Sequence, residues 1–266
     1  TTQVFAVQTT DLQALTTAQL VALSSTQVAA LLPSQVAALT TQQAQGLTSA
    51  QVVALLSSQV VSLETADLQV LTTVQIAAFE TGDLRAFTST QLAALTTAQV
   101  IALTTVQVAA LESSQIGELT TGQAAALTTA QVVALTTSQV AAFTSVQVPA
   151  LTTAQVVVLT SGQIQALTLK QVADLTTRHF QALTTAQLRA LTTTQVRVVE
   201  TDDLRVLNTA QVQSLQTDDL AALTTGQFAS LTTAQVVALT SGQIAALTAA
   251  QVVAMTPAQA GALATT

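Results

Sequence analysis

The 266-residue chain contains no cysteine, tryptophan or tyrosine, only one histidine, and few charged residues, which make up 7% of the sequence. Without cysteine there is neither a disulfide framework nor a thiolate metal site. Catalysis requires unlike chemical groups that converge in a pocket, and a single imidazole without any thiol offers few of them. We therefore expect a protein that is not an enzyme and that carries no metal and no cofactor.

Long apolar runs and positive charge are also scarce. The longest apolar segments, such as Val28–Leu32 and Val52–Leu56, are five residues long, which is too short to cross a bilayer. The formal net charge is −7, so the phosphates of a nucleic acid would be repelled. The sequence predicts neither a membrane-spanning segment nor a nucleic-acid partner.

What fills the chain instead is one octapeptide, whose plainest copy is Leu-Thr-Thr-Ala-Gln-Val-Val-Ala at Leu127–Ala134. Leucine recurs at every eighth residue from Leu15 to Leu263, with a few apolar substitutes, and glutamine recurs four residues after it. No insertion or deletion breaks the frame. Because a one-residue slip would disturb all later stacking, the frame predicts about 33 repeats of equal geometry in one continuous solenoid over residues 1–266.

Each octapeptide contains the signals of a helix start. Pro33 and Pro257 occupy the same place in their repeats, and proline is favoured at the first helical residue. This alignment places threonine at the N-cap and glutamine at the third helical residue, which together form a Thr-x-x-Gln capping box. The leucine before the cap and the apolar fourth helical residue form a hydrophobic staple. Below, residues whose numbers are multiples of eight are called the cap position, and residues three further on the third position.

The predicted fold is an all-α solenoid of short helices, each about two turns long. Such helices are unstable alone, so their stability must come from stacking on neighbours. We expect roughly two or three helices per turn of the solenoid, with coils spaced as packed helices are. The alternative is a β-solenoid, because threonine and valine favour strands. Scarce glycine and asparagine, and the lack of period-two alternation, argue against it. Five phenylalanines fall on interior positions and are predicted to lie in the core, whereas Phe5 does not: Phe79, Phe87, Phe143, Phe180 and Phe228.

Four acidic variants of the helix start carry Asp at the third position: 64–68, 80–84, 200–204 and 216–220. Clustered carboxylates could bind Ca²⁺, but the helix dipole already favours acids at a helix start. Their spacing also matches neither an EF-hand nor a glycine-rich nonapeptide calcium repeat, so we favour the structural interpretation. Pro149 is the fifth residue of its helix, where it removes a backbone hydrogen bond. Its position predicts a local distortion of the helix or, alternatively, a hinge.

Basic residues gather between positions 170 and 205 and define a candidate partner patch: Lys170, Arg178, His179, Arg189, Arg197 and Arg205. The last three share one place in the octapeptide and are expected to form a ladder that could hold an anionic polymer or a lipid surface. The alternative is a solvated stripe that pairs with nearby acids. His179 replaces the glutamine and is expected to be a substitute capping residue, because no second histidine or cysteine is near enough to complete a metal site.

Runs such as Leu127–Ala142 resemble the Thr/Gln/Ala-rich tandem repeats of very large bacterial surface or secreted proteins of the adhesin-like kind. The resemblance covers the whole chain and implies an extracellular, multi-repeat context. It transfers no functional residue to this sequence.

We expect a structural or adhesive array, a stalk or a filament subunit, that lies outside the cell or on its surface. The chain enters and leaves in the middle of a repeat, which suggests a segment of a longer array or a unit that joins others end to end. Two alternatives involve binding: ice or another crystalline surface through paired threonines such as Thr128-Thr129, or a protein, polysaccharide or other anionic partner through the 170–219 patch. Hydroxyls that fold back onto backbone N–H groups would argue against the first.

Overall fold

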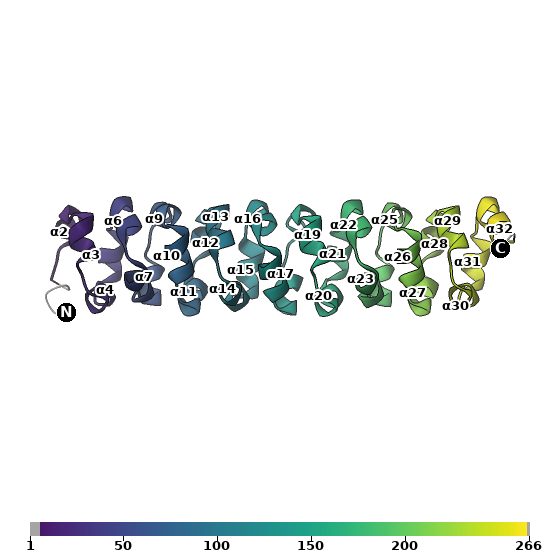
Figure 1. Ribbon diagram of the computed structural model, residues 1–266, viewed down its shortest axis with the longest axis horizontal. Helices are drawn as coiled ribbons and strands as arrows, with labels where there is room; N and C mark the ends of the chain where they lie inside the picture. Colours follow the sequence, from purple (N-terminus) through teal and green to yellow (C-terminus); the bar gives the residue numbers. More distant parts are fainter. Residues whose placement is uncertain (1–5, 265–266) are drawn as a thin grey trace. The chain divides into compact units, whose positions relative to one another are not determined.

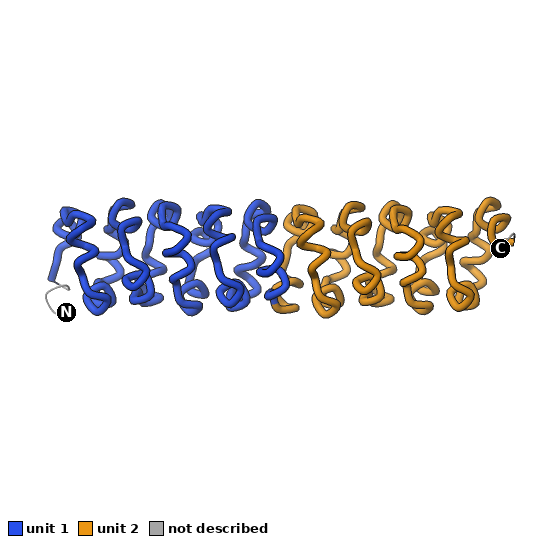
Figure 2. Tube along the Cα trace, viewed as in Figure 1, with its two compact units in different colours: residues 1–135 blue, residues 136–266 orange. Residues whose placement is uncertain are grey.

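The computed structural model describes residues 6–264, and within them the chain forms short helices and no strand. The prediction of an all-α repeat solenoid is confirmed (Figure 1). The chain divides into two compact units, Thr1–Leu135 and Thr136–Thr266, which Figure 2 colours separately. The octapeptide frame runs through the boundary between them without a gap.

The helices of the first unit are α2 Thr9–Ala14, α3 Thr17–Val21, α4 Ser25–Ala29, α5 Pro33–Ala37, α6 Thr41–Gly46, α7 Ser49–Val53, α8 Ser57–Val60, α9 Thr65–Val70, α10 Thr73–Ala78, α11 Thr81–Ala86, α12 Ser89–Ala94, α13 Thr97–Ala102, α14 Thr105–Ala110, α15 Ser113–Glu118, α16 Thr121–Ala126 and α17 Thr129–Ala134. Those of the second unit are α18 Thr137–Ala141, the 3₁₀ helix η1 Val148–Ala150, α19 Thr153–Val157, α20 Ser161–Ala166, α21 Leu169–Asp174, α22 Thr177–Ala182, α23 Thr185–Ala190, α24 Thr193–Val196, α25 Thr201–Arg205, α26 Thr209–Ser214, α27 Thr217–Ala222, α28 Thr225–Ser230, α29 Thr233–Val237, α30 Ser241–Ala245, α31 Ala249–Val253 and α32 Pro257–Leu263.

The link between consecutive helices is short and extended. After α17, Leu135 has φ −60° and ψ 140°, and Thr136 has φ −70° and ψ 160°. Both conformations are open to any L-residue, and no residue of the described part has a positive φ. The fold therefore turns a corner at every repeat without glycine, which explains why the sequence can be so poor in it.

Within each unit, residues that touch between neighbouring coils are 25 to 31 positions apart. Helix α3 packs against α6, and α14 packs against α17. One coil consequently takes about 28 residues, the spacing of a recurrent contact between coils, or three and a half octapeptides. The expectation of two or three helices per coil is wrong, because the extended link redirects the chain by only a little more than a right angle at each repeat.

Two apolar residues per octapeptide form the core of each unit. The fourth helical residue is 0–2% exposed from Leu12 to Val236, and the leucine before the cap is 3–8% exposed from Leu31 to Leu239. Burial of a side chain of this size is worth about 1.5–3 kcal/mol. The five phenylalanines predicted to lie in the core are buried there, and the rings of Phe79 and Phe87 meet edge to face with centroids 5.5 Å apart. Phe5 lies outside the described residues.

Candidate functional site

The third-position glutamine makes the capping box that the sequence predicts. In α10 the N–H of Thr72 donates to Gln75 Oε1 at 2.7 Å, and the N–H of Gln75 donates to Thr72 Oγ1 at 3.2 Å. The same reciprocal pair recurs along both units, including Thr256 and Gln259 beside Pro257. A helix with the complete box thus begins with two free backbone N–H groups satisfied.

The same glutamine also joins one coil to the next, a role that the sequence did not reveal. The Nε2 group of Gln75 donates to the carbonyls of Ala44 at 3.1 Å, Gln45 at 3.1 Å and Leu47 at 2.7 Å. These carbonyls lie at the C-terminal end of α6, where a helix leaves its last C=O groups unpaired. In the second unit, Gln195 makes the equivalent contacts to residues 28 to 31 positions earlier.

We call this line of bonds the glutamine seam: the third-position side chains and the carbonyls 28 to 31 residues before them. From Gln35 onward these glutamines are only 1–5% exposed. A buried amide costs free energy unless its hydrogen bonds are made, and here the oxygen serves the helix start while the nitrogen serves the previous coil. One feature of the sequence indicates this second role: the third position is glutamine rather than glutamate. Glutamate also completes a capping box, but it has no N–H to donate to the previous coil.

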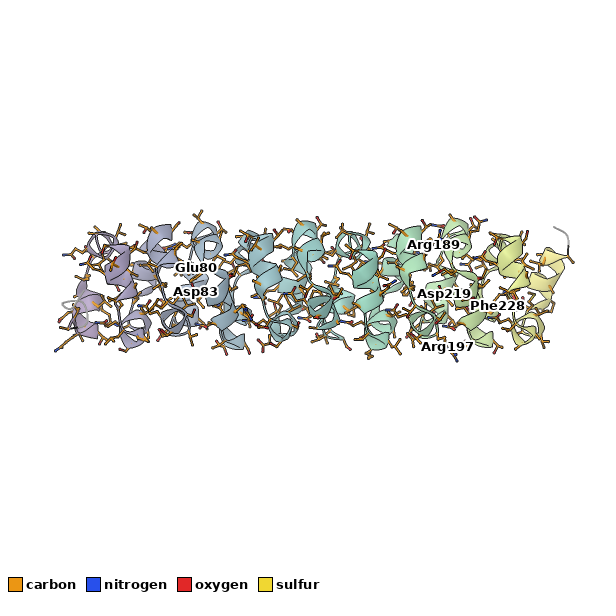
Figure 3. All side chains as sticks on the ribbon, turned by 90° about the horizontal axis from the view of Figure 1, so that it is seen from below. Glu80, Asp83, Arg189, Arg197, Asp219 and Phe228 are labelled. Atoms are coloured by element: carbon orange, nitrogen blue, oxygen red, sulfur yellow. The ribbon has the colours of Figure 1, made fainter. Side chains whose placement is uncertain are left out.

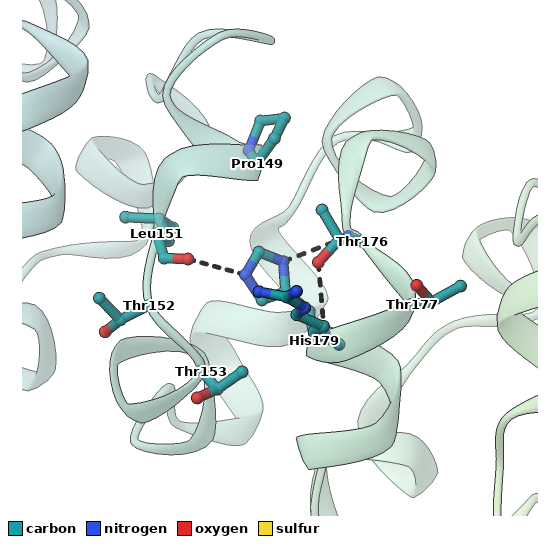
Figure 4. Close-up of a pocket in the computed structure, with 8 residues that line it drawn as sticks. Pro149, Leu151, Thr152, Thr153, Thr176, Thr177 and His179 are labelled. Atoms are coloured by element: carbon teal, nitrogen blue, oxygen red, sulfur yellow. Dashed lines mark hydrogen bonds between the residues drawn. The ribbon is translucent and has the colours of Figure 1, made fainter.

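His179 reproduces both bonds of the glutamine with an imidazole ring (Figure 4). Its Nδ1 accepts the N–H of Thr176 at 3.2 Å, and its Nε2 lies 2.8 Å from the carbonyl of Leu151. That pair of partners requires the neutral tautomer with the proton on Nε2. Burial lowers the pKa of His179, against the opposing effect of the Leu151 carbonyl. The interpretation of His179 as a substitute capping residue is confirmed, and the ring is 3% exposed.

Pro149 distorts its repeat as predicted. The helix expected there is reduced to the 3₁₀ turn η1, because proline has no N–H to donate and its ring crowds the preceding turn. A hollow of about 440 Å³ lies beside it (Figure 4). Its lining consists of Pro149, Leu151, Thr152, Thr153, Thr176, Thr177, Arg178 and His179. A similar hollow in the first unit, lined by Thr16, Thr17, Thr40 and Thr41, shows that the shape belongs to the repeat.

The basic residues of the candidate partner patch are spread around the second unit. Arg189 lies on α23, Arg197 follows α24 and Arg205 ends α25. Since one coil takes three and a half octapeptides, residues eight apart point to different sides. Figure 3 shows Arg189 and Arg197 at opposite edges of this part of the molecule. The expected ladder of Arg189, Arg197 and Arg205 is therefore wrong.

The remaining members of the patch have different surroundings. Lys170 forms an ion pair with Asp174 on its own helix, Arg178 lines the hollow beside Pro149, and His179 is buried in the seam. The structure thus does not bring these six residues together on one basic surface, although Arg178 and Arg205 lie on the packed helices α22 and α25. Elsewhere, Arg85 pairs with Glu112 across neighbouring coils of the first unit.

The acidic third-position residues are buried in the seam as well. Asp67, Asp83, Asp203 and Asp219 are 2–4% exposed, and Figure 3 shows Asp83 beside the cap residue Glu80. Among residues 6–264, no three Asp, Glu, His or Cys side chains come together as a metal ion would require. Their placement supports the structural interpretation of the acidic variants.

The cap hydroxyls fold back onto the backbone. Thr128 Oγ1 accepts the N–H of Gln131 at 3.2 Å, and Thr136 Oγ1 accepts the N–H of Gln139 at 3.2 Å. A coil of three and a half octapeptides also places different residue types above one another in adjacent coils. Both observations argue against a flat hydroxyl lattice that matches ice.

Short capped helices, a two-residue link and a glutamine seam define an all-α tandem-repeat solenoid. The chain belongs to the ALTTAQ repeat family, whose repeat matches residues 4–41, 76–113, 108–145, 198–233, 213–249 and 233–265. No curated protein matches the sequence. Within the described residues, no helix has the length and apolar character needed to cross a bilayer.

Proposed function

We propose that the chain is a structural array without catalytic activity, a stalk or filament element that lies outside the cell or on its surface. The observation that carries this proposal is the glutamine seam. Its donors and acceptors occur in every octapeptide of the standard type, so the contact between two coils can be repeated along an array of any length. The adhesin-like resemblance of the repeats supports the extracellular location.

The lack of a distinctive cleft supports a role other than catalysis. The single imidazole is buried with both ring nitrogens engaged. The hollow beside Pro149 and its counterpart in the first unit have the same arrangement of threonine pairs. A reaction centre requires a nucleophile, a base and an electrophilic group in one place, and a repeated surface supplies the same few groups at every coil.

We further propose that a second copy of the chain stacks on the surface formed by α30, α31 and α32. Ile244 is 37% exposed and Val252 51% exposed there, whereas the equivalent Val212 and Val236 are fully buried under later coils. At the other end, Gln19 is exposed while the equivalent Gln35 is buried. One surface therefore offers carbonyls and apolar side chains, and the other offers amide donors, so the two are complementary.

Light scattering after gel filtration, followed by electron microscopy at high dilution, tests the stacking. We expect rods longer than one chain, and we expect Val252→Lys to shorten them because it places a charge in the contact. Val74→Lys is the matched control, since Val74 is 67% exposed on the side of the first unit. Particles of single-chain mass at every concentration would refute end-to-end association.

Protease treatment of intact source cells tests the location. We expect the array to be degraded while a cytoplasmic marker survives, because an extracellular stalk is accessible to the protease. Protection of the array until the cells are lysed would refute the extracellular assignment and leave the structural role untouched.

An anionic partner is the alternative. A pull-down on a polyanionic resin at low salt compares the native chain with a variant that carries Arg189→Ala, Arg197→Ala and Arg205→Ala. The spread of these residues around the coil predicts equal, weak retention of both proteins. Strong retention of the native chain alone would favour the binding function over the structural one.

A further inference from the structure

Aspartate replaces the seam glutamine in a particular kind of repeat. Each time the third position is Asp, the cap residue is Glu or Gln and never the usual hydroxyl residue. We call the four such pairs within the stacked coils the acidic joints: Glu64–Asp67, Glu80–Asp83, Glu200–Asp203 and Gln216–Asp219. The two changes occur together, which indicates that they compensate for each other.

The aspartate keeps one half of the glutamine's task and loses the other. The backbone N–H of Glu64 still donates to the carboxyl of Asp67, and that of Glu80 to Asp83. A carboxylate has no N–H, however, so it can donate nothing to the carbonyls of the previous coil. Within residues 6–264, Oδ2 of Asp67, Asp83 and Asp219 is buried and has no hydrogen-bond partner.

Gln216 shows how the cap residue compensates. Its Nε2 donates to the carbonyl of Arg189 at 2.9 Å. Arg189 precedes Asp219 by 30 residues, one of the separations at which seam glutamines find their acceptors. The donor has therefore moved from the third position to the cap. In the other three acidic joints the cap residue is glutamate, which can donate to a carbonyl only when it carries a proton.

We propose that the acidic joints are proton-binding sites in the seam. The buried carboxyl of each joint holds a proton and, as a carboxylic acid, donates it toward the carbonyls of the previous coil. Neighbouring coils are then joined more firmly in mildly acidic solution than in neutral solution.

The electrostatics of the joints agree with this geometry. Burial, assisted by the charge of Glu64, raises the pKa of Asp67 to about 6. Burial together with Glu200 and Asp202 raises the pKa of Asp203 to about 6. Burial also raises the pKa of Asp83 and of Asp219. Because these values lie above the ordinary value near 4, the folded chain binds more protons than the unfolded chain between about pH 4 and pH 6, and its stability falls as the pH rises through that window.

The charged surroundings of the two joints in the first unit are simple. Glu64 is the titratable neighbour of Asp67, and the packed helices α6 and α12 carry none. Asp83 has Glu80 and Arg85 near it on its own repeat, and Arg85 pairs with Glu112 of the next coil. The packed helices α8 and α14 carry no charged residue. Ser57 donates its hydroxyl to Asp83 Oδ1 at 2.8 Å, which leaves Oδ2 as the oxygen able to hold the proton.

The joints in the second unit have more charged neighbours. Around Asp203, helix α25 contributes Glu200, Asp202 and Arg205, α22 contributes Arg178 and His179, α21 contributes Lys170 and Asp174, and α28 contributes none. Around Asp219, the neighbours are Asp218 on α27, Arg189 on α23 and Arg197 after α24, and α30 contributes none. His179 titrates in the opposite sense, so the test removes it.

The test is the urea midpoint of the full chain between pH 4 and pH 8, in a His179→Gln background. We expect the midpoint to fall between about pH 4 and pH 6, with up to about a hundredfold change in the unfolding constant for the Asp67 joint and for the Asp203 joint. A variant with Asp67→Asn, Asp83→Asn, Asp203→Asn and Asp219→Asn is expected to lose this slope. The matched control, Asp202→Asn with Asp218→Asn, alters exposed carboxylates beside two joints and is expected to keep most of the slope, because burial is the largest cause of the raised pKa of Asp203 and of Asp219.

A second variant tests the proposal even if the variant with four asparagines does not fold. It carries threonine at the cap and glutamine at the third position of every joint, as in Glu64→Thr with Asp67→Gln. These changes rebuild the standard capping box and seam, so the urea midpoint is expected to stay constant between pH 4 and pH 6. Infrared spectra at pH 5 are expected to show the C=O band of protonated carboxyls in the parent and not in this variant. A slope that survives in both variants, or a parent without that band, would overturn the proposal.

Discussion

A single side chain, the third-position glutamine, satisfies a helix start and the end of a helix one coil earlier. Its amide oxygen accepts a hydrogen bond for the first task and its N–H groups donate for the second, a combination that glutamate lacks. Histidine comes nearest, and His179 takes over both bonds when its proton is on Nε2. The chemistry of the amide group therefore explains why glutamine is retained where glutamate would cap equally well.

Gln75→Glu is expected to destabilise the first unit by about 1–3 kcal/mol, because the new carboxyl group would face the carbonyls of the α6 end without an N–H to donate. The urea midpoint at pH 8 measures the effect. Gln45→Glu makes the same chemical change on an exposed side chain and is expected to alter the midpoint little. Equal shifts for the two variants would show that the seam bonds of Gln75 add nothing.

Protonation of His179 is expected to weaken the second unit. Its folded pKa is lowered by burial, so the neutral ring's contribution is complete above the ordinary pKa near 6.5 and is lost as the pH falls below it. His179→Gln is expected to remove this acid sensitivity and leave stability at pH 8 nearly unchanged. Thermal melts of both proteins between pH 8 and pH 5 check it, and parallel curves would contradict it.

At the scale of one helix, stability depends on the cap and on an uninterrupted run to the next leucine. Most caps are threonines that accept the N–H of the third residue, but Leu56 has no hydroxyl, and α8 keeps only the glutamine half of its box. Pro149 shows the opposite defect, since its cap is intact and its body is distorted.

Leu56→Thr is expected to stabilise the first unit by about 0.5–2 kcal/mol, since it restores a cap that accepts the N–H of Gln59. Leu56 is 54% exposed, so little burial is lost in the exchange. Leu56→Ala provides the comparison because it shortens the side chain without adding a hydroxyl. If both variants unfold at the same urea concentration, the hydroxyl contributes nothing.

Pro149→Ala is expected to convert η1 into an α-helix and to raise stability by up to about 3 kcal/mol, because alanine restores the missing N–H and relieves the crowding by the proline ring. Circular dichroism at the helix minimum and the thermal midpoint follow the change. Pro257→Ala is the control, since Pro257 occupies the first helical residue of α32, where no hydrogen bond is lost. A distortion that persists in Pro149→Ala would have another cause.

Features confined to one octapeptide could be predicted from the sequence, and features between octapeptides could not. The Thr-x-x-Gln cap, the staple and the buried phenylalanines depend on neighbours a few residues away. The number of helices per coil depends on the angle of the Leu–Thr link, and no residue type in the sequence indicates that angle. The seam and the separation of Arg189 from Arg197 both follow from that angle, so they were missed together.

At the scale of the molecule, each unit is a stack in which every coil contacts only its neighbours. Stability is then close to a sum over repeats and interfaces. Neighbouring coils must keep the same eight-residue spacing, because the cap, the third position and the leucine contact partners one coil away.

Insertion of one extra Leu-Thr-Thr-Ala-Gln-Val-Val-Ala copy before Leu103 is expected to leave the thermal midpoint nearly unchanged, since the inserted residues bring their own cap, core and seam. Insertion of only its first four residues at the same place is expected to lower the midpoint, because the two sides of the seam fall out of phase. Calorimetry compares the two proteins. Equal loss in both would show that the partners across the seam are specific and cannot be exchanged between repeats.

The half-integral coil has a consequence for how such a gene can change. Recombination between near-identical copies adds or removes whole octapeptides, and each product keeps the frame and is expected to fold. Each such event also rotates all later repeats by the angle of one repeat. Residues of adjacent coils that had been in contact then lie on different faces. A ligand site assembled from several coils would be lost at the first change in length, whereas a structural array would only become longer or shorter.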